Sequence, residues 1–433
     1  MNIKRHSFVI TVTAIIILNS PIYSQEISND YIALYESEKY SECLKIINTA
    51  LLEFYQKRVE DKKIPDEMVS LTNIGQKVDL VKLFRNRKEK GFFIEDNHSI
   101  QQLHIYYARC LARLNRKREA LNHYIQALRF SRFEQEKDDI IFYEISQVFL
   151  SMQEPLYFQG YIDSLEQAYS FNNNNYKYSL ELGLALFSTE EKKKAAFHLE
   201  RYVSGADRVD SEVYLKLASL YESIKNYLKA EKYYNEYLKE NSSNGEIHFS
   251  LGYLCYKHTG NFVLAESSFK AALKFTKEDD IYRKAKSHEY LGDIYFSNMN
   301  LQASLDHYNQ CLIAENKLSE DLKLKQEELK NITLQANNLK KDILYKQDFQ
   351  NYEEYEMLLD KKGKIETEIN DLNYKIKSLN PGKLRWNMAE IYNKTGDLQR
   401  AIELYRQCIF YNYNASNARD MITKLQLKIK RGF

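Results

Sequence analysis

The chain has 433 residues, enough to bury several domains' worth of core, but only 4 prolines and 13 glycines. So few turn-forming residues favour long helices over a turn-rich β protein. Charged residues make up 28% of the chain, yet the net charge is only +2. This balance excludes the strong overall field that attracts nucleic acid or an anionic membrane.

The first 24 residues have the pattern of an export signal. Lys4 and Arg5 supply positive charge ahead of an apolar run, Phe8–Leu18. Pro21 follows the run, and a suitable cleavage sequence ends at Ser24. The run is too short to span a bilayer. We therefore expect an exported protein, periplasmic, envelope-associated or secreted, whose mature chain has no membrane span. The alternative is an apolar first helix of the folded protein.

Residues 25–57 predict a helical hairpin. Cys43, Ile47 and Ala50 in its second half are three and four residues apart, a spacing that places them on one helical face. Residues 58–98 then form an insertion or linker. It carries a basic cluster followed by aromatic residues: Arg85, Arg87, Lys88, Lys90, Phe92 and Phe93. This segment is either a docking element for an acidic partner or a short amphipathic helix packed on its neighbours.

From residue 99 to residue 317 a pattern of small and aromatic residues recurs at intervals of roughly 34 to 40 residues. One copy has Leu251-Gly252, Ala265, Phe269 and Ala272, the next has Leu291-Gly292, Tyr295, Ser304, Tyr308 and Cys311, and a last copy after residue 380 has Met388-Ala389, Tyr392, Ala401, Tyr405 and Cys408. Small residues let two helices cross closely, and the aromatic rings fill the space beside the contact.

This pattern resembles the tetratricopeptide repeat (TPR), a pair of antiparallel helices of about 34 residues. The resemblance implies an all-α solenoid of helical hairpins, or superhelix, because no single unit can bury its apolar face alone. We expect a first hairpin in residues 25–57 and about six units in residues 99–317. One of these, residues 139–171, is degenerate because Pro155 and Gly160 interrupt it. Residues 380–433 complete the array with a last unit and a capping helix.

Residues 318–379 predict an antiparallel coiled-coil hairpin inserted into the array. Apolar residues repeat every seven positions in both halves: Leu322, Leu329, Ala336 and Ile343, then Leu358, Ile365, Leu372 and Leu379. Lys325, Lys346 and Lys362 at seam positions, together with Gly363, weaken this pairing. We therefore expect the arm to be mobile, or to be completed by a partner or by self-association.

Residues of the kinds that carry catalysis or bind metals do not form a recognisable motif. The sequence has no Gly-rich phosphate loop, Cys-x-x-Cys, His-Glu-x-x-His or Gly-x-Ser-x-Gly. The histidines recur at two repeat positions, His104, His248 and His288 at one and His123, His198 and His307 at the other. A shared position indicates packing rather than a metal site. We predict no enzyme activity, no metal and no cofactor.

The TPR resemblance implies that the first helix of each unit lines a concave, partner-binding groove. The predicted groove residues are Leu184, Phe187, Phe249, Tyr253, Tyr256, Phe296 and Trp386. Chaperone-binding TPRs hold a terminal carboxylate with lysines and asparagines. The matching positions here are apolar, aromatic or acidic. An aromatic groove suits an extended or helical peptide with apolar anchors. The alternative is that these rings fill space between adjacent units.

The sequence therefore predicts a non-enzymatic protein–protein interaction scaffold or adaptor of the cell envelope or periplasm. The alternative is a structural subunit of a large envelope machine, such as a motility or secretion apparatus. An enzyme within the insertion and a nucleic-acid role are both disfavoured, because paired acid–base candidates are few and the basic clusters are short.

Replacing Tyr253, Tyr256 and Phe296 together with alanine tests the groove. If these rings contact a partner, binding is lost while circular dichroism shows nearly unchanged helicity. Unfolding of the triple variant would instead identify them as core residues.

Overall fold

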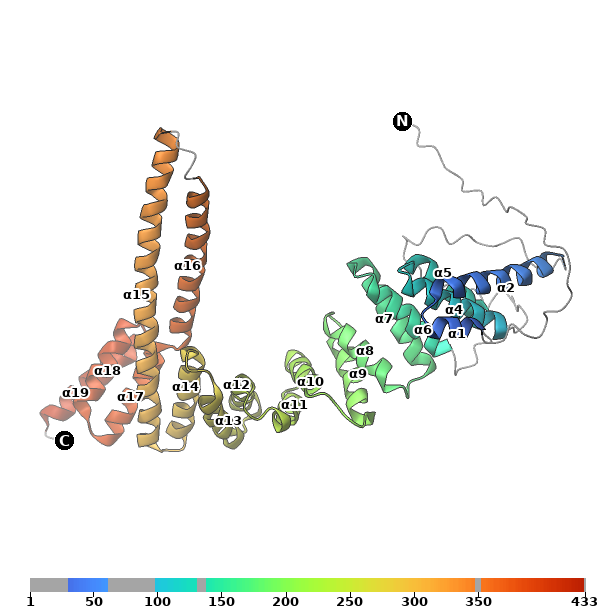
Figure 1. Ribbon diagram of the computed structural model, residues 1–433. Helices are drawn as coiled ribbons and strands as arrows, with labels where there is room; N and C mark the ends of the chain where they lie inside the picture. Colours follow the sequence, from blue (N-terminus) through green and yellow to red (C-terminus); the bar gives the residue numbers. More distant parts are fainter. Residues whose placement is uncertain (1–29, 61–97, 131–137, 347–351, 432–433) are drawn as a thin grey trace. The chain divides into compact units, whose positions relative to one another are not determined.

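The computed structural model describes residues 30–60, 98–130, 138–346 and 352–431, and every element in these ranges is helical (Figure 1). The predicted export signal and nearly all of the predicted insertion, residues 58–98, lie outside the described residues. The chain divides into two compact units, Met1–Ala206 and Asp207–Phe433. The structure is thus an all-α array of helical hairpins, as predicted.

Consecutive helices of the first unit pack against each other as hairpins. They are α1 (Asp30–Glu36) with α2 (Tyr40–Glu60), α4 (His98–Arg113) with α5 (Lys117–Arg129), α6 (Asp138–Ser151) with α7 (Pro155–Phe171), and α8 (Tyr176–Phe187) with α9 (Lys192–Gly205). One hydrophobic core runs from α1 to α8. Because each hairpin leaves an apolar face for the next, the core is continuous along this unit.

The expected interruption of the α6–α7 hairpin is wrong. Pro155 is the first residue of α7, a position where its missing N–H has no helical partner to lose. Gly160 lies inside α7, where an added Cβ would be 3.1 Å from the ring of Phe149. Both residues therefore fit a complete hairpin.

The second unit continues the hairpin pattern. It contains α10 (Ser211–Ser223), α11 (Tyr227–Glu240), α12 (Gly245–Leu254) with a π-helical turn η1 (Cys255–Thr259), α13 (Phe262–Phe275), α14 (Ile281–Ser297), α15 (Leu301–Lys346), α16 (Tyr352–Ser378), α17 (Pro381–Thr395), α18 (Leu398–Phe410) and α19 (Ala415–Lys430). The first part of α15 pairs with α14, and the rest of α15 extends away beside α16 (Figure 1).

The small residues of the repeat lie where the helices of a hairpin cross. An added Cβ would be 2.6 Å from Leu199 at Gly183, 2.9 Å from Phe269 at Gly252 and 2.5 Å from Tyr308 at Gly292. No side chain larger than hydrogen fits these crossings without displacing the partner ring or methyl group. The repeated glycine is therefore a packing requirement.

Helices α15 and α16 form a long antiparallel hairpin. Lys325 pairs with Glu368 at 2.7 Å and Lys361 with Glu328 at 3.2 Å. Lys325 at the predicted seam is thus neutralised by an acidic residue of the other helix. At the base, Leu318 and Leu379 are buried with Ala285 and Ala314. This apolar packing fixes the base of the hairpin in the repeat array. The description of the hairpin as a coiled coil stays a prediction.

All five cysteines are free and buried, and they occupy defined repeat positions. The Cys311 and Cys408 thiols donate to carbonyls 26 residues earlier, those of Ala285 (3.1 Å) and Gly382 (3.5 Å). The Cys43 thiol donates to the carbonyl of Tyr31, 12 residues earlier. Ser304 makes the same 12-residue contact to Gly292. Cys43, Cys311 and Cys408 therefore fill two different small-residue positions.

Two glycine substitutions test the crossing at Gly292. Gly292→Ala should lower the free energy of unfolding by about 1–3 kcal/mol, because its Cβ meets the fully buried Tyr308 ring. Gly363→Ala on α16 meets nothing within 4 Å and should raise it by about 0.5–1 kcal/mol. Urea unfolding followed by fluorescence of Trp386, the only tryptophan, measures both. Equal stabilisation by the two substitutions would contradict the close crossing.

Candidate partner-binding surfaces

The seven predicted groove residues are divided between the two compact units. Leu184 and Phe187 lie on α8 of the first unit, and the other five lie on α12, η1, α14 and α17 of the second. Leu184 is exposed at 37%. Phe187 is half-buried, with the Lys192 ammonium 5.6 Å from its ring centroid.

Three predicted groove residues of the second unit converge on a ring that sequence reasoning missed, Tyr290 of α14. Its centroid lies 6.3 Å from that of Phe249, 5.7 Å from Tyr253 and 5.1 Å from Tyr256. Tyr290 is 5% exposed and also stacks on Phe269. Phe249, Tyr253 and Tyr256 remain half-buried. These rings therefore pack the α12–α14 contact and still present part of their surface to solvent.

Phe296 and Trp386 are half-buried in the next two hairpins. Phe296 packs against the core of Tyr308, Leu384 and their neighbours, and the Lys394 ammonium lies 4.7 Å from its ring centroid. The indole of Trp386 packs edge-on to Tyr405, with centroids 5.1 Å apart. Each of these side chains is thus fixed by a core neighbour on one side.

A buried carboxylate, that of Asp293 on α14, supports this surface. Asp293 is 8% exposed. The Tyr308 hydroxyl and the Asn387 amide donate to Oδ1 at 2.7 and 3.1 Å. The Tyr256 hydroxyl and the Lys383 ammonium donate to Oδ2 at 3.0 and 2.6 Å. Through these four hydrogen bonds Asp293 joins η1, α14, α15 and α17.

The pKa directions agree with this arrangement. Burial, followed by the nearby Asp293 carboxylate, raises the pKa of Tyr308 and of Tyr256, so both hydroxyls stay protonated as donors. Burial alone would lower the pKa of Lys383, but the Asp293 carboxylate more than offsets it and raises the pKa above its usual value. Lys383 is therefore charged at neutral pH.

Two further buried ion pairs hold the base of the α15–α16 hairpin. Lys286 donates to Glu289 at 2.6 Å and to the carbonyl of Ser378 at 3.2 Å. Arg385 of α17 pairs with Glu315 of α15 at 2.7 Å, and their side chains are 10% and 5% exposed. No local sequence pattern predicts these contacts with the hairpin, because Arg385 lies 70 residues from Glu315 and Lys286 lies 92 residues from Ser378.

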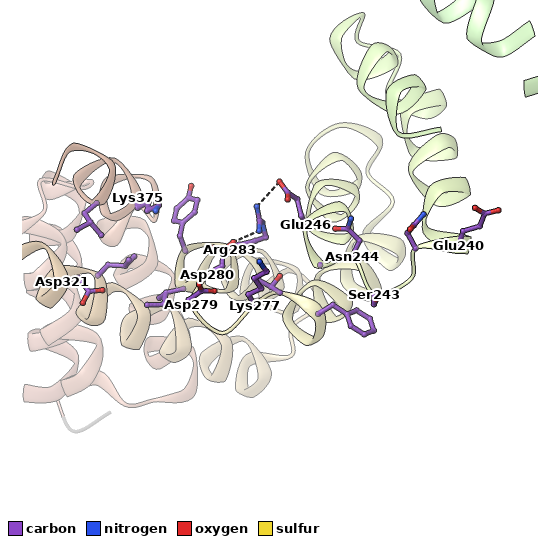
Figure 2. A pocket seen from close by; sticks show the side chains of 18 residues that line it. Glu240, Ser243, Asn244, Glu246, Lys277, Asp279, Asp280, Arg283, Asp321 and Lys375 are labelled. Atoms are coloured by element: carbon purple, nitrogen blue, oxygen red, sulfur yellow. Dashed lines mark hydrogen bonds and ion pairs between the residues drawn. The ribbon is translucent and has the colours of Figure 1, made fainter. Parts of the chain in front are cut away.

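A hollow of about 1030 Å³ lies where the base of the hairpin meets the turns before α12 and α14. Figure 2 shows Asp321 and Lys375 at one end and Glu240 and Ser243 at the other. Between them, Arg283 reaches Glu246 at 3.2 Å and Asp280 at 2.5 Å. Its lining has charges of both signs, several of them already paired, and this mixture favours no single class of small ligand.

Neither a metal centre nor a membrane span emerges from the described ranges. In residues 30–60, 98–130, 138–346 and 352–431, no group of three or more His, Cys, Asp or Glu side chains could hold a metal ion. Of the helices in those ranges, none combines the length and the apolar character needed to cross a membrane.

The comparisons with known proteins agree with the hairpin geometry. Residues 215–281 and residues 382–412 each match a family model described as a tetratricopeptide repeat. The first match spans α10 to α13 and the second spans α17 and α18. The chain therefore contains tetratricopeptide repeats. Such repeats typically bind proteins and are non-enzymatic, and they are the only domains that the matches identify.

The chain is also similar to one curated protein and to several solved structures. It is 34% identical over 90 residues to Protein MSS2, mitochondrial, from Saccharomyces cerevisiae, a match covering 20% of this chain and 25% of the yeast protein. The match thus spans about a quarter of that relative's length.

Three of the similar solved structures are less than 20% identical to this chain. MamA from Desulfovibrio magneticus RS-1 is 17% identical with a TM-score of 0.31, covering 43% of this chain and 99% of that one. The C-terminal part of a TPR repeat-containing protein from Cytophaga hutchinsonii is 11% identical with a TM-score of 0.34, covering 66% and 93%. YrrB, described as a TPR protein with an unusual peptide-binding site, is 16% identical with a TM-score of 0.33, covering 44% and 91%. Likeness at this level says nothing of function.

Substituting Asp293 tests the buried network. Asp293→Asn leaves the Lys383 ammonium without its closest carboxylate, so we expect a loss of about 3 kcal/mol in unfolding free energy. Lys383→Met in the same chain should recover part of that loss, because the unpaired charge is then gone. The matched surface control is Glu403→Gln, whose partner Arg406 is 3.5 Å away with both side chains 59% exposed, and it should change stability by less than about 0.5 kcal/mol. Similar small effects at both sites would contradict the network.

Proposed function

We propose that this protein is an exported scaffold or adaptor that holds segments of partner proteins in the cell envelope or periplasm. The observation that carries the proposal is the set of half-buried aromatic side chains on the first helices of successive hairpins, Phe249, Tyr253, Tyr256, Phe296 and Trp386. Aromatic side chains held by core neighbours lose little conformational entropy on binding, which favours affinity.

The partner segment that suits this surface is an extended or helical peptide with apolar anchors. The Lys257 ammonium lies 4.9 Å from the centroid of Tyr256, and Lys394 lies 4.7 Å from that of Phe296. These cations cover parts of the ring faces, and cation–π contacts at exposed sites are weak. A bound peptide therefore displaces them at little cost or pairs them with its own carboxylates.

The α15–α16 hairpin would act as a second contact surface or as a spacer. Support for this comes from its anchored base, where Arg385 and Glu315 form a buried pair. Support for export comes from the pattern of residues 1–24 alone. The name of the yeast relative assigns that protein to mitochondria, so the compartment needs its own experiment.

A cross-linking pull-down from intact cells distinguishes the two surfaces. One variant replaces residues 325–368 with a short Gly-Ser turn, which keeps the buried base residues Leu318 and Leu379. Another carries Tyr253→Ala, and its control carries Tyr374→Ala on α16, where the side chain is 67% exposed. We expect Tyr253→Ala to reduce capture of a partner by about tenfold, consistent with the loss of one anchor, while the other two variants keep it.

The opposite pattern, with capture lost only in the shortened hairpin, would assign recognition to α15 and α16. If every form captures only copies of itself, the structural-subunit alternative replaces the adaptor. Far-UV circular dichroism and Trp386 fluorescence identify any variant that has simply unfolded.

A further inference from the structure

Two hairpins contain the same pair of facing histidines, of which His104 is buried and His123, His288 and His307 are half-buried. His104 on α4 faces His123 on α5 with their Nδ1 atoms 3.0 Å apart, and His288 on α14 faces His307 on α15 with their Nδ1 atoms 2.8 Å apart. Each pair is separated by 19 residues. The repeat positions that the sequence analysis assigned to packing are therefore the two halves of one contact.

Aromatic neighbours hold the paired rings in place. His123 stacks on Tyr107 with centroids 4.1 Å apart, and His104 stacks on Phe130 at 5.7 Å. In the second unit His307 stacks on Tyr295 at 5.4 Å, with the rings 6° from parallel. His104 is only 2% exposed. Rings packed in this way cannot turn toward water without opening the contact between the two helices.

The Nδ1–Nδ1 hydrogen bond requires a bare nitrogen on one of the two rings, and its half-buried site favours neutral rings. One imidazole donates its N–H, and the other must accept with a bare lone pair. A first added proton places a charge in a buried site, and a second leaves two N–H groups facing each other. Burial is also the main reason that the pKa of His104 falls to about 3 and those of His123 and His288 to about 4, while the pKa of His307 is lowered as well.

Charged groups around the pairs do not compensate an added proton. Beside His123, Glu119 favours protonation and Arg116 opposes it, and these two residues pair with each other at 2.6 Å. Beside His288, Lys284 opposes protonation. Around His307, Asp306 on α15 and Glu266 on α13 favour it and Lys270 on α13 opposes it. Glu266 already accepts from Lys270 and Tyr295, both at 2.7 Å.

We propose that the two histidine pairs are acid-sensitive contacts that join the two helices of their hairpins at neutral pH and weaken them as the pH falls. In the second unit the contact lies between α14, which carries Asp293, and α15, which continues into the long hairpin. Acidification therefore loosens the base from which α15 extends. If the proposed function holds, it also weakens the support of the partner-binding surface.

In other hairpins, different residues occupy the two histidine positions. These positions lie four residues before and 15 residues after the small residue of the repeat, as His288 and His307 do relative to Gly292. Counted from Gly183, these positions are Ser179 and His198, and the Ser179 hydroxyl and His198 Nδ1 are buried without a hydrogen-bond partner. Counted from Ala218, they are Tyr214 and Tyr233, whose rings lie near parallel with centroids 6.3 Å apart. A pair of tyrosines therefore fits at these two positions and can replace the histidines without a basic group.

The sign of the effect follows from the pKa shift. The folded pKa of His288 is below its ordinary value of 6.5, so the unfolded chain binds more protons at intermediate pH. The contribution to stability is complete above about pH 6.5 and is lost as the pH falls toward 4. For His288 alone, linkage predicts a roughly 30-fold rise in the unfolding equilibrium constant at pH 5 relative to high pH.

The test uses the full chain and the fluorescence of Trp386 on α17, which reports the second unit. Urea unfolding is measured from pH 8 to pH 5 for the wild type and for the His288→Tyr, His307→Tyr double variant. Carboxylates that titrate in this range are common to both proteins. We expect the wild-type unfolding constant to rise at least about tenfold more than that of the variant. Equal pH dependence in the two proteins would overturn the proposal.

A second measurement does not depend on the variant folding. Proton–carbon NMR of the histidine rings in the wild-type protein follows protonation directly. The four paired rings should stay neutral at pH 6 and take up protons only together with loss of structure in α4–α5 and α14–α15. Titration of these rings near their ordinary pKa in an otherwise unchanged fold would also overturn the proposal.

Discussion

In the second unit, one buried carboxylate joins helices on both sides of the long α15–α16 hairpin. Asp293 of α14 accepts hydrogen bonds from Tyr256, Tyr308, Lys383 and Asn387. The last two belong to α17 and are 90 and 94 residues away in the chain. A buried charge is costly unless its partners are in place. The array therefore resumes at α17 in an arrangement that brings Lys383 and Asn387 to this carboxylate.

The α15–α16 hairpin can leave the array because its base is closed around the same region. Leu318 and Leu379 pack together with Ala285, and Arg385 reaches across to Glu315. The chain then turns at Asn380, whose φ of 47° is left-handed, and its side chain caps α17. Pro381 begins that helix, a position that suits proline. The turn at Asn380 and the buried ion pairs thus both place the start of the last repeat at α17.

The fold was predictable from the sequence because one steric rule recurs. Every close crossing needs a glycine or another small residue, and Gly183, Gly252 and Gly292 mark three of them in register. The seven-residue spacing of apolar residues within residues 318–379 likewise predicted a helical hairpin inserted into the array. Pro155 misled the prediction because proline both interrupts helices and begins them, and only the position of the preceding turn decides between these roles.

The binding surface was less predictable. Half-buried aromatic positions follow from the repeat, but their common contact with Tyr290 depends on how α12 and α14 pack, which no local pattern encodes. The buried role of Asp293 required knowing that α17 returns to α14. The histidine pairs had a readable signal, the repeated spacing of 19 residues, but the repeat pattern alone did not reveal that the two positions face each other. A periodic pattern identifies which face of a helix is buried. Only the structure shows which residues on that face contact residues far away in the chain.

The most direct test of the account is a photo-reactive amino acid placed at Tyr253 in the full chain and activated in living cells. The same amino acid at Tyr374, an exposed side chain near the base end of α16, serves as the matched position. The account predicts that position 253 cross-links to a partner protein and that Tyr253 is therefore part of the binding surface. Cross-links to a partner from position 374 with none from position 253 would contradict it.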